Sequence, residues 1–239
     1  MSLNGSIADS TALITGSNRG LGAAFTQALL DSGVKKVYAT ARNPEMITAA
    51  GVTPIALDVT DHASVVAAAE RAQDVTLLIN NAGITTNTDA LHGDLVNFQT
   101  EFTTNALGAL DVTRTFAPIL ARNGGGAVLN VLSGLSWVAM ADTAAYCASK
   151  SAAWSITNSL RQQLAGQNTQ VTALHMGFVD TDLIAGLDVP KADPADIVRA
   201  ALEGLEKGEV EVVADDISRM LKSGLSGDLE ALYEALAGA

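Results

Sequence analysis

The stretch TALITGSNRGLG, residues 11–22, decides the fold of this chain. Its apolar start predicts a strand over Thr11–Thr15, and the residues after the turn predict a helix over Gly20–Ser32. The three glycines between them let the backbone turn sharply and approach a pyrophosphate, which the helix N-terminus attracts through its dipole and free N–H groups. The spacing is G-x-x-x-G-x-G rather than the more widespread G-x-G-x-x-G. A tight turn without a ligand is the alternative interpretation.

Outward from this turn, short β-branched runs alternate with Ala-rich helical stretches along the whole chain. Such alternation predicts right-handed βαβ units and a parallel sheet. About seven strands are visible rather than eight, so a doubly wound parallel sheet is favoured over a closed barrel. No linker or repeat interrupts the pattern. We therefore expect one α/β domain over residues 1–239, with three layers in the order helix, sheet, helix.

The boundaries follow from the local patterns. The predicted strands are Thr11–Thr15, Lys36–Thr40, Thr53–Leu57, Val75–Ile79, Ala127–Leu132, Gln170–His175 and Glu209–Val213. The predicted helices after the first are Asp61–Gln73, Leu95–Arg122, Thr143–Ala165, Asp193–Lys207 and Ser226–Leu236. Asp61 and Asp193 are the expected N-caps.

Composition narrows the class of protein. Of 239 residues, 48% are hydrophobic and 17% charged, which suits a globular core. The net charge of −12 argues against a nucleic-acid or anionic-membrane partner, because both require basic surface. The single cysteine, Cys147, excludes an internal disulfide, and three scattered histidines predict no metal site. No membrane span or secretory signal is visible, so we expect a cytoplasmic protein.

The end of the second predicted strand bears on the choice of cofactor. An acidic residue there would accept a hydrogen bond from a ribose 2′-hydroxyl, but the stretch YATARN at 38–43 contains none. Arg42 and Arg19 are instead placed to face a 2′-phosphate, or are solvated surface residues. Asp58, followed by Val59, is a candidate acceptor for an adenine amino group, or else caps a turn. These residues favour NADP(H) over NAD(H).

The stretch YCASK at 146–150 carries the candidate chemistry. Tyr146 and Lys150 lie one helical turn apart on the same face, where the ammonium is expected to lower the pKa of the phenol. Ser133 ends a predicted strand, and its hydroxyl is placed to hold a substrate oxygen beside Tyr146. Asn105 lies in the middle of a long helix and predicts a local distortion there. At the end of the fourth strand, the stretch NNAG at 80–83 leaves room for a cofactor.

Taken together, TGSNRGLG, NNAG, Asn105, Ser133 and YCASK resemble the short-chain dehydrogenase/reductase superfamily in its compact, single-domain branch. The resemblance implies a Rossmann fold, a nicotinamide cofactor and a Ser-Tyr-Lys-Asn tetrad. Tyr146 would then be the general acid or base, Lys150 would bind the nicotinamide ribose, Ser133 would polarise the carbonyl, and Asn105 would hold a water. The cofactor contacts implied by the motifs and the resemblance are Gly16, Ser17, Asn18, Arg19, Gly20, Leu21, Gly22, Arg42, Asp58, Val59, Asn80, Ala82, Gly83, Tyr146, Lys150, Gly177, Val179 and Thr181.

One position departs from the family pattern. The proline that often precedes Gly177 is Met176 in this chain. This loosens the turn after the sixth strand without removing a catalytic group.

The leading functional hypothesis is an NADP-dependent reductase of a ketone or aldehyde, working on a small-molecule carbonyl or alcohol. The alternatives are an NAD-dependent alcohol dehydrogenase of the same family and a non-catalytic, cofactor-sensing binding protein. The resemblance also points to a homodimer or homotetramer built on the helices at 95–122 and 143–165. Trp154 on the second of these helices is a candidate contact, or else folds back on its own core.

Overall fold

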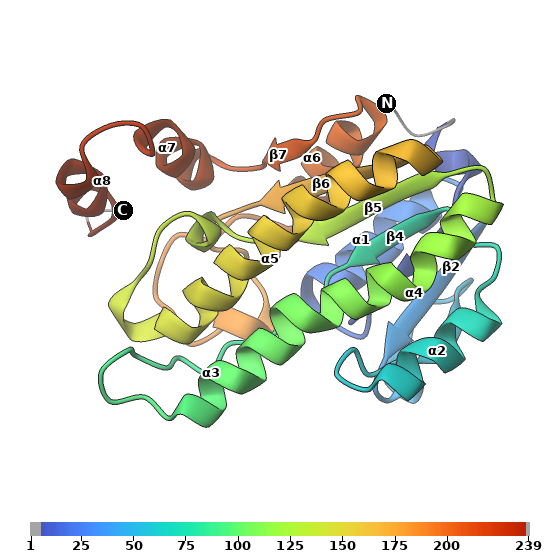
Figure 1. Cartoon of the computed structure of the whole chain (residues 1–239), viewed down its shortest axis with the longest axis horizontal. Coiled ribbons are helices and arrows are strands. Elements are labelled where there is room, and N and C mark those ends of the chain that lie inside the picture. Colours follow the sequence, from blue (N-terminus) through green and yellow to red (C-terminus); the bar gives the residue numbers. More distant parts are fainter. Residues whose placement is uncertain (1–5, 238–239) are drawn as a thin grey trace.

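The computed structural model describes residues 6–237, and residues 1–5 and 238–239 of the predicted domain lie outside the described part. Within it, the strands form a seven-stranded parallel sheet in the order β3-β2-β1-β4-β5-β6-β7 (Figure 1). The strands are β1 Thr11–Ile14, β2 Lys36–Ala41, β3 Thr53–Ala56, β4 Leu77–Asn80, β5 Gly126–Val131, β6 Thr169–His175 and β7 Glu211–Val213. The order reverses between β1 and β4, as in a Rossmann fold, so a crevice opens at their carboxyl ends. The predicted fold class is confirmed.

Helices cover both faces of the sheet. They are α1 Gly20–Asp31, α2 His62–Arg71, α3 Leu95–Phe102, α4 Ala109–Arg122, α5 Ala144–Leu164, α6 Pro194–Glu206, α7 Asp216–Gly224 and α8 Leu229–Ala237. One apolar core lies under α1 and α6, and a second lies under α2, α4 and α5. Asp61 and Asp193 cap α2 and α6 as predicted, since their side chains accept from the N–H groups of Ala63 and Ala195.

Two helical predictions need correction. The helix predicted over Leu95–Arg122 is interrupted by a π-helical turn at Thr103–Gly108, which separates α3 from α4. This turn contains Asn105 and confirms the local distortion predicted there. Helix α7 was not predicted at all. Its start is marked by a capping box between Asp215 and Ser218, and its apolar residues recur at helical spacing.

The C-terminal helix also begins later than predicted. Helix α8 starts at Leu229 instead of Ser226, because the Asp228 carboxylate accepts from the N–H groups of Glu230 and Ala231. Helices α7 and α8 lie at one end of the molecule, beyond β7 (Figure 1).

The turn between β1 and α1 depends on two glycines. Gly16 has a φ of +69°, a conformation that side chains disfavour. A Cβ on Gly22 would lie 2.1 Å from the carbonyl oxygen of Gly16 and 2.6 Å from the amide nitrogen of Asn81. Helix α1 therefore approaches the strand ends at backbone distance only because Gly22 has no side chain.

A buried chain of polar side chains crosses the sheet under α4 and α5. The Asn80 amide on β4 donates to Thr113 on α4 and to the Asn130 carbonyl on β5, both at 2.8 Å. The Asn130 amide in turn donates to Thr157 on α5 at 2.8 Å. These bonds join two strands and two helices inside an otherwise apolar core.

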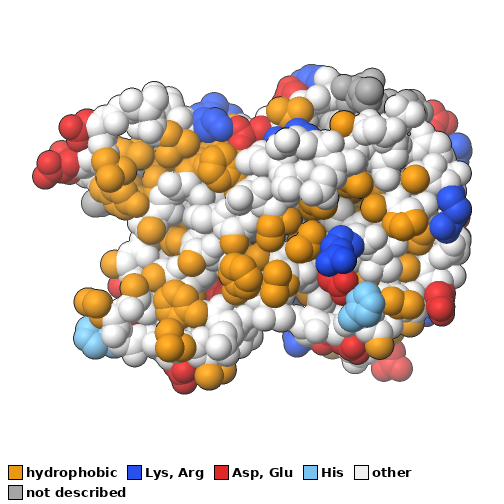
Figure 2. Space-filling model, in the orientation of Figure 1, with side chains coloured by type: hydrophobic (Ala, Val, Ile, Leu, Met, Phe, Trp, Pro, Cys, Tyr) orange, Lys and Arg blue, Asp and Glu red, His pale blue; other side chains and the backbone are white. Residues whose placement is uncertain are grey.

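The face of the molecule formed by α3, α4 and α5 exposes several large apolar side chains. Leu95 and Phe102 are exposed on α3, and Leu107 is exposed in the π-helical turn that follows. Figure 2 shows hydrophobic side chains gathered where this helix runs beside α5. Large exposed apolar patches mark interaction surfaces in soluble proteins.

Candidate active site

A cleft of about 940 Å³ opens at the carboxyl ends of the strands. It lies at the edge where the strand order reverses, which is where ligands bind in open parallel sheets. Most of the predicted site residues line it. These are Gly16, Asn18, Arg19, Gly20, Leu21, Gly22, Arg42, Asp58, Val59, Ala82, Gly83, Ser133, Tyr146, Lys150, Gly177, Val179 and Thr181.

Three predicted site residues do not line this cleft. The Ser17 hydroxyl is buried, donating to the Ile14 carbonyl and accepting from the Thr40 N–H. The Asn80 side chain is part of the polar chain across the sheet. The third residue, Asn105, is hydrogen-bonded to Ile84 in the loop after β4. Ser17 and Asn80 as cofactor contacts, and Asn105 as the residue that holds a water, therefore stay predictions.

The glycine turn fits a dinucleotide phosphate. Helix α1 begins without a side-chain cap, because Arg19 at the N-cap makes no capping hydrogen bond. Its first turn also carries no acidic residue. The uncapped N–H groups at the helix N-terminus can bind an anion, and Gly16, Gly20 and Gly22 let it approach the backbone closely because they have no Cβ.

The nucleotide end of the cleft holds Arg42 and Asp58. The Asp58 carboxylate accepts from both the N–H and the hydroxyl of Thr60. These hydrogen bonds, and to a lesser extent the charge of Arg42, hold the pKa of Asp58 below its ordinary value. Arg19 pairs with Asp182 at 3.4 Å, and both side chains are largely exposed. Asp58 thus caps a turn while also lining the cleft.

Tyr146 and Ser133 both line the cleft, and the Ser133 hydroxyl lies close enough to the phenol to affect its pKa. The Ser133 hydroxyl also accepts from the N–H of Leu135 at 3.1 Å. Burial raises the pKa of the Tyr146 phenol well above its ordinary value, and the neighbouring Ser133 hydroxyl only partly offsets this rise. The direction is therefore opposite to the lowering expected from the spacing between Tyr146 and Lys150.

Lys150 lies behind Tyr146, only 4% exposed. Its Nζ donates to the Val131 carbonyl at 2.8 Å and lies 5.6 Å from the centre of the Tyr146 ring. Burial lowers the pKa of Lys150 to about 8, against an opposing effect of Glu101. The pKa of an ammonium group that is already poorly solvated changes strongly when hydroxyl groups or charges are brought next to it.

Asn105 and Glu101 hold the loop that follows β4. The Asn105 side chain accepts from the Ile84 N–H and donates to the Ile84 carbonyl, both at 2.9 Å. It also donates to the Ser149 hydroxyl, which donates to the Tyr146 carbonyl. Glu101, fully buried one turn earlier, accepts from the Thr86 N–H at 2.8 Å. Glu101 was not predicted as a site residue, although its four-residue spacing from Asn105 is a usable signal.

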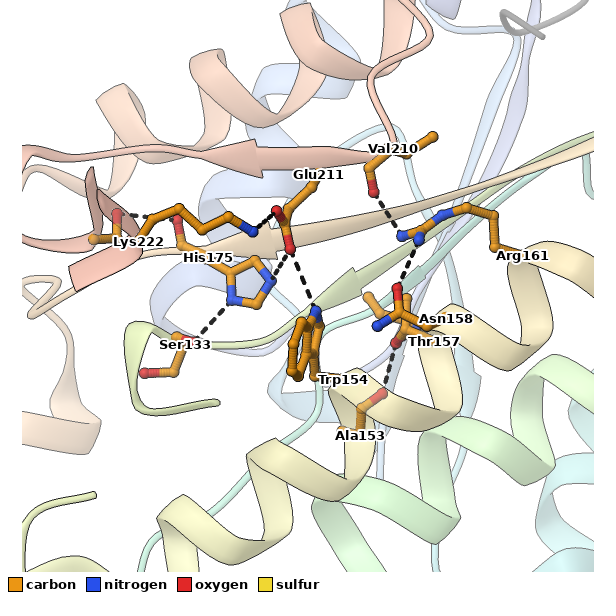
Figure 3. Close-up of polar contacts among 12 residues, drawn as sticks. Ser133, Ala153, Trp154, Thr157, Asn158, Arg161, His175, Val210, Glu211 and Lys222 are labelled. Carbon is orange, nitrogen blue, oxygen red and sulfur yellow. Dashed lines mark hydrogen bonds and ion pairs between the residues drawn. The ribbon is translucent and has the colours of Figure 1, made fainter. Parts of the chain in front are cut away.

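A second group missed from the sequence supports Ser133 from behind (Figure 3). His175 is fully buried, with its Nδ1 2.9 Å from the Ser133 carbonyl and its Nε2 3.3 Å from the Glu211 carboxylate. Glu211 also pairs with Lys222 on α7 and accepts from the Trp154 indole. The ring of Trp137 stacks on His175 at 3.9 Å. The network connects Ser133 to β7, α5 and α7.

The family model for short chain dehydrogenases matches residues 10–190 of this chain. The chain belongs to the short-chain dehydrogenase family. Its fold is similar to the crystal structure of a short-chain dehydrogenase from Burkholderia cenocepacia in complex with NADP. The two share 37% identity with a TM-score of 0.93, over 97% of this chain and 99% of that one.

Curated relatives of this short-chain dehydrogenase differ in the substrates that they are named for. A Schizosaccharomyces pombe NADP-dependent 3-hydroxy acid dehydrogenase is 30% identical, over 87% of this chain and 91% of that protein. A Cereibacter sphaeroides sorbitol dehydrogenase is 32% identical, over 79% of this chain and 78% of that protein. Membership of the family therefore establishes an oxidoreductase without specifying its substrate. Among residues 6–237, no helix combines the length and the apolar character that crossing a bilayer requires.

We predict that Glu211 stabilises the fold in a pH-dependent way. Its contact with His175, aided by Lys222, lowers the pKa of Glu211 from an ordinary 4.5 to about 2. A carboxyl group with a lowered pKa stabilises the fold above its unfolded pKa, and this contribution is lost as the pH falls from about 4.5 toward 2. The contribution at neutral pH is about 3 kcal/mol.

The measurement is urea unfolding of wild type and Glu211→Gln at pH 6 and pH 3. The wild type should lose more free energy of unfolding between these pH values than the variant, which cannot titrate at this position. The exposed Glu230→Gln on α8 controls for the loss of one negative charge and should follow the wild type. Equal losses in wild type and Glu211→Gln would contradict the prediction.

Proposed function

We propose that this short-chain dehydrogenase transfers a hydride between NADP(H) and a ketone or aldehyde, or the corresponding secondary alcohol. The observation that carries the proposal is that Ser133, Tyr146 and the buried Lys150 line the same cleft as the glycine turn. A polarising hydroxyl, a proton donor and a cation are the groups that carbonyl reduction requires.

The cofactor, when bound, supplies or accepts the hydride at the carbonyl carbon. In reduction, the hydroxyls of Ser133 and Tyr146 hold the carbonyl oxygen, and Tyr146 gives its proton to that oxygen as the new C–H bond forms. Lys150 stabilises the resulting phenolate by its charge. Asn105 positions this group by tying Ile84 to Ser149 and through it to the backbone of Tyr146.

The proposed preference for NADP(H) rests on Arg42. It lines the nucleotide end of the cleft directly after β2. The stretch 38–43 contains no acidic residue that would accept a hydrogen bond from a ribose 2′-hydroxyl. A guanidinium group pairs with a phosphate through two parallel hydrogen bonds. The crystal structure of the Burkholderia cenocepacia relative contains NADP, which supports this choice. We also propose a cytoplasmic location, which suits the free, buried Cys147.

The first test removes the hydroxyl of Tyr146. Tyr146→Phe should lower kcat by at least about 100-fold, because general acid catalysis is worth roughly 10² to 10⁴. NADPH binding, measured by fluorescence titration, should change little. Tyr38→Phe is the matched control, since Tyr38 bonds to Asp74 and does not line the cleft. A Tyr146→Phe variant that keeps a tenth of the wild-type rate would refute the assigned role.

The second test concerns the cofactor. Arg42→Asp should shift the preference from NADPH toward NADH, because a carboxylate repels a 2′-phosphate and accepts from a 2′-hydroxyl. Steady-state kinetics with both cofactors measure the ratio, and Arg114→Asp on the exposed side of α4 is the charge-matched control. A wild type that prefers NADH would favour the NAD-dependent alternative.

We further propose that two copies of the chain associate through the apolar face over α3–α5. The exposed Leu95, Phe102 and Leu107 support this, although the Trp154 indole is bonded to Glu211 within its own chain. Sedimentation equilibrium at micromolar concentration should give a dimer or tetramer mass. A single species at the chain mass of 24.5 kDa would contradict the proposal.

A further inference from the structure

The cleft continues beyond Ser133 and Tyr146 into a space that hydride transfer alone does not explain. Its wall comes from the loop after β5, the segment after Thr181, and helices α7 and α8. The side chains lining this wall are mostly apolar and include Leu135, Met140, Leu187, Ile217, Leu221 and Leu236. A wall of this kind favours apolar substrate groups, because their transfer from water to the wall lowers the free energy.

This wall is a built part of the fold. Val138, Leu221 and Leu232 form a buried cluster that fixes α7 and α8 to the loop after β5. The Tyr233 hydroxyl accepts from the Ala139 N–H at 3.0 Å. The two helices pack so closely that a Cβ on Gly224 would lie 2.6 Å from a methyl group of Leu232.

The charges around the cleft are arranged against an anionic substrate. Among the described residues, the basic side chains that line it are Arg19, Arg42 and Lys150. The two arginines follow β1 and β2 at the nucleotide end, and Lys150 is bonded to the Val131 carbonyl. The other acidic residues that line the cleft, besides Asp58, are Asp142 and Asp182, and Asp182 pairs with Arg19. In the part of the chain that the structure describes, the apolar wall itself carries no lysine or arginine, and Asp142 in the same cleft would repel a carboxylate or phosphate.

We infer that the substrate is an uncharged ketone or aldehyde with an apolar body, which lies against the wall formed by α7, α8 and the segment 183–187. The inference rests on the proposed function, since it takes Ser133 and Tyr146 as the groups that hold the carbonyl. It further states that the site selects against carbonyl compounds that carry a carboxylate or phosphate on the same body.

The test compares two ketones of equal length, 2-octanone and 7-oxooctanoate, which differ only in a terminal methyl or carboxylate. With NADPH, the kcat/KM for 2-octanone should exceed that for 7-oxooctanoate by about tenfold or more. Equal values, or faster reduction of the keto acid, would overturn the inference and leave the proposed function standing.

A matched pair of variants locates the effect. Leu236→Arg places a cation in the wall and should raise kcat/KM for 7-oxooctanoate relative to 2-octanone by about tenfold. Leu229→Arg adds the same charge on the same helix at a position that is 68% exposed and outside the cleft, so its ratio should stay at the wild-type value. An unchanged ratio in Leu236→Arg would show that the substrate lies elsewhere.

A binding measurement separates failure of the inference from failure of the proposed function. If NADPH binds and neither ketone is reduced, the proposed function is wrong. The two ketones are then titrated into the NADPH-loaded protein, with the fluorescence of the bound cofactor as the readout. Tighter binding of 2-octanone would still support the apolar site, and equal or weaker binding would overturn it.

Discussion

The contact between Gly22 and the carbonyl of Gly16 is the constraint on which the whole site depends. It lets the N-terminus of α1 reach the ends of the strands. The same turn is tied to the end of β4, because the Asn81 amide donates to the carbonyls of Thr15 and Gly16. The Thr15 hydroxyl returns the link by accepting from the N–H groups of Asn81 and Ala82. Two strand ends thus form one rigid base for the cleft.

Local patterns were enough to predict most of this architecture. Strands and helices follow from apolar runs and caps, and the edge at which Gly16, Ser133 and Tyr146 meet follows from parallel strands ending together. The direction in which the side chain turns was not predictable at Ser17, because its partner Thr40 comes from another strand. The support of Ser133 by His175 and Glu211 also escaped prediction, since residues 133, 175 and 211 are brought together only by the fold.

Burial of Tyr146 and Lys150 works against the charged form of the phenol and of the amine alike. It raises the pKa of Tyr146 and lowers that of Lys150, so each group alone resists ionisation. A phenolate and an ammonium formed together in this space would stabilise one another more than they could in water. The spacing of the two residues indicated their partnership, but their pKa shifts depend on burial, on the charge of Glu101 and on the Ser133 hydroxyl, which only the fold brings together.

The polar chain from Thr113 through Asn80 and Asn130 to Thr157 also bears on how the sheet aligns. Strands β4 and β5 are buried almost throughout, so their hydrophobic pattern has no alternation to distinguish one register from another. If β5 shifted by two residues relative to β4, apolar side chains would still meet. The two asparagines would be separated, and their buried amides would lose their hydrogen-bond partners. The asparagine pair thus fixes the register of β4 and β5. It disfavours shifted registers that hydrophobic burial alone would not exclude.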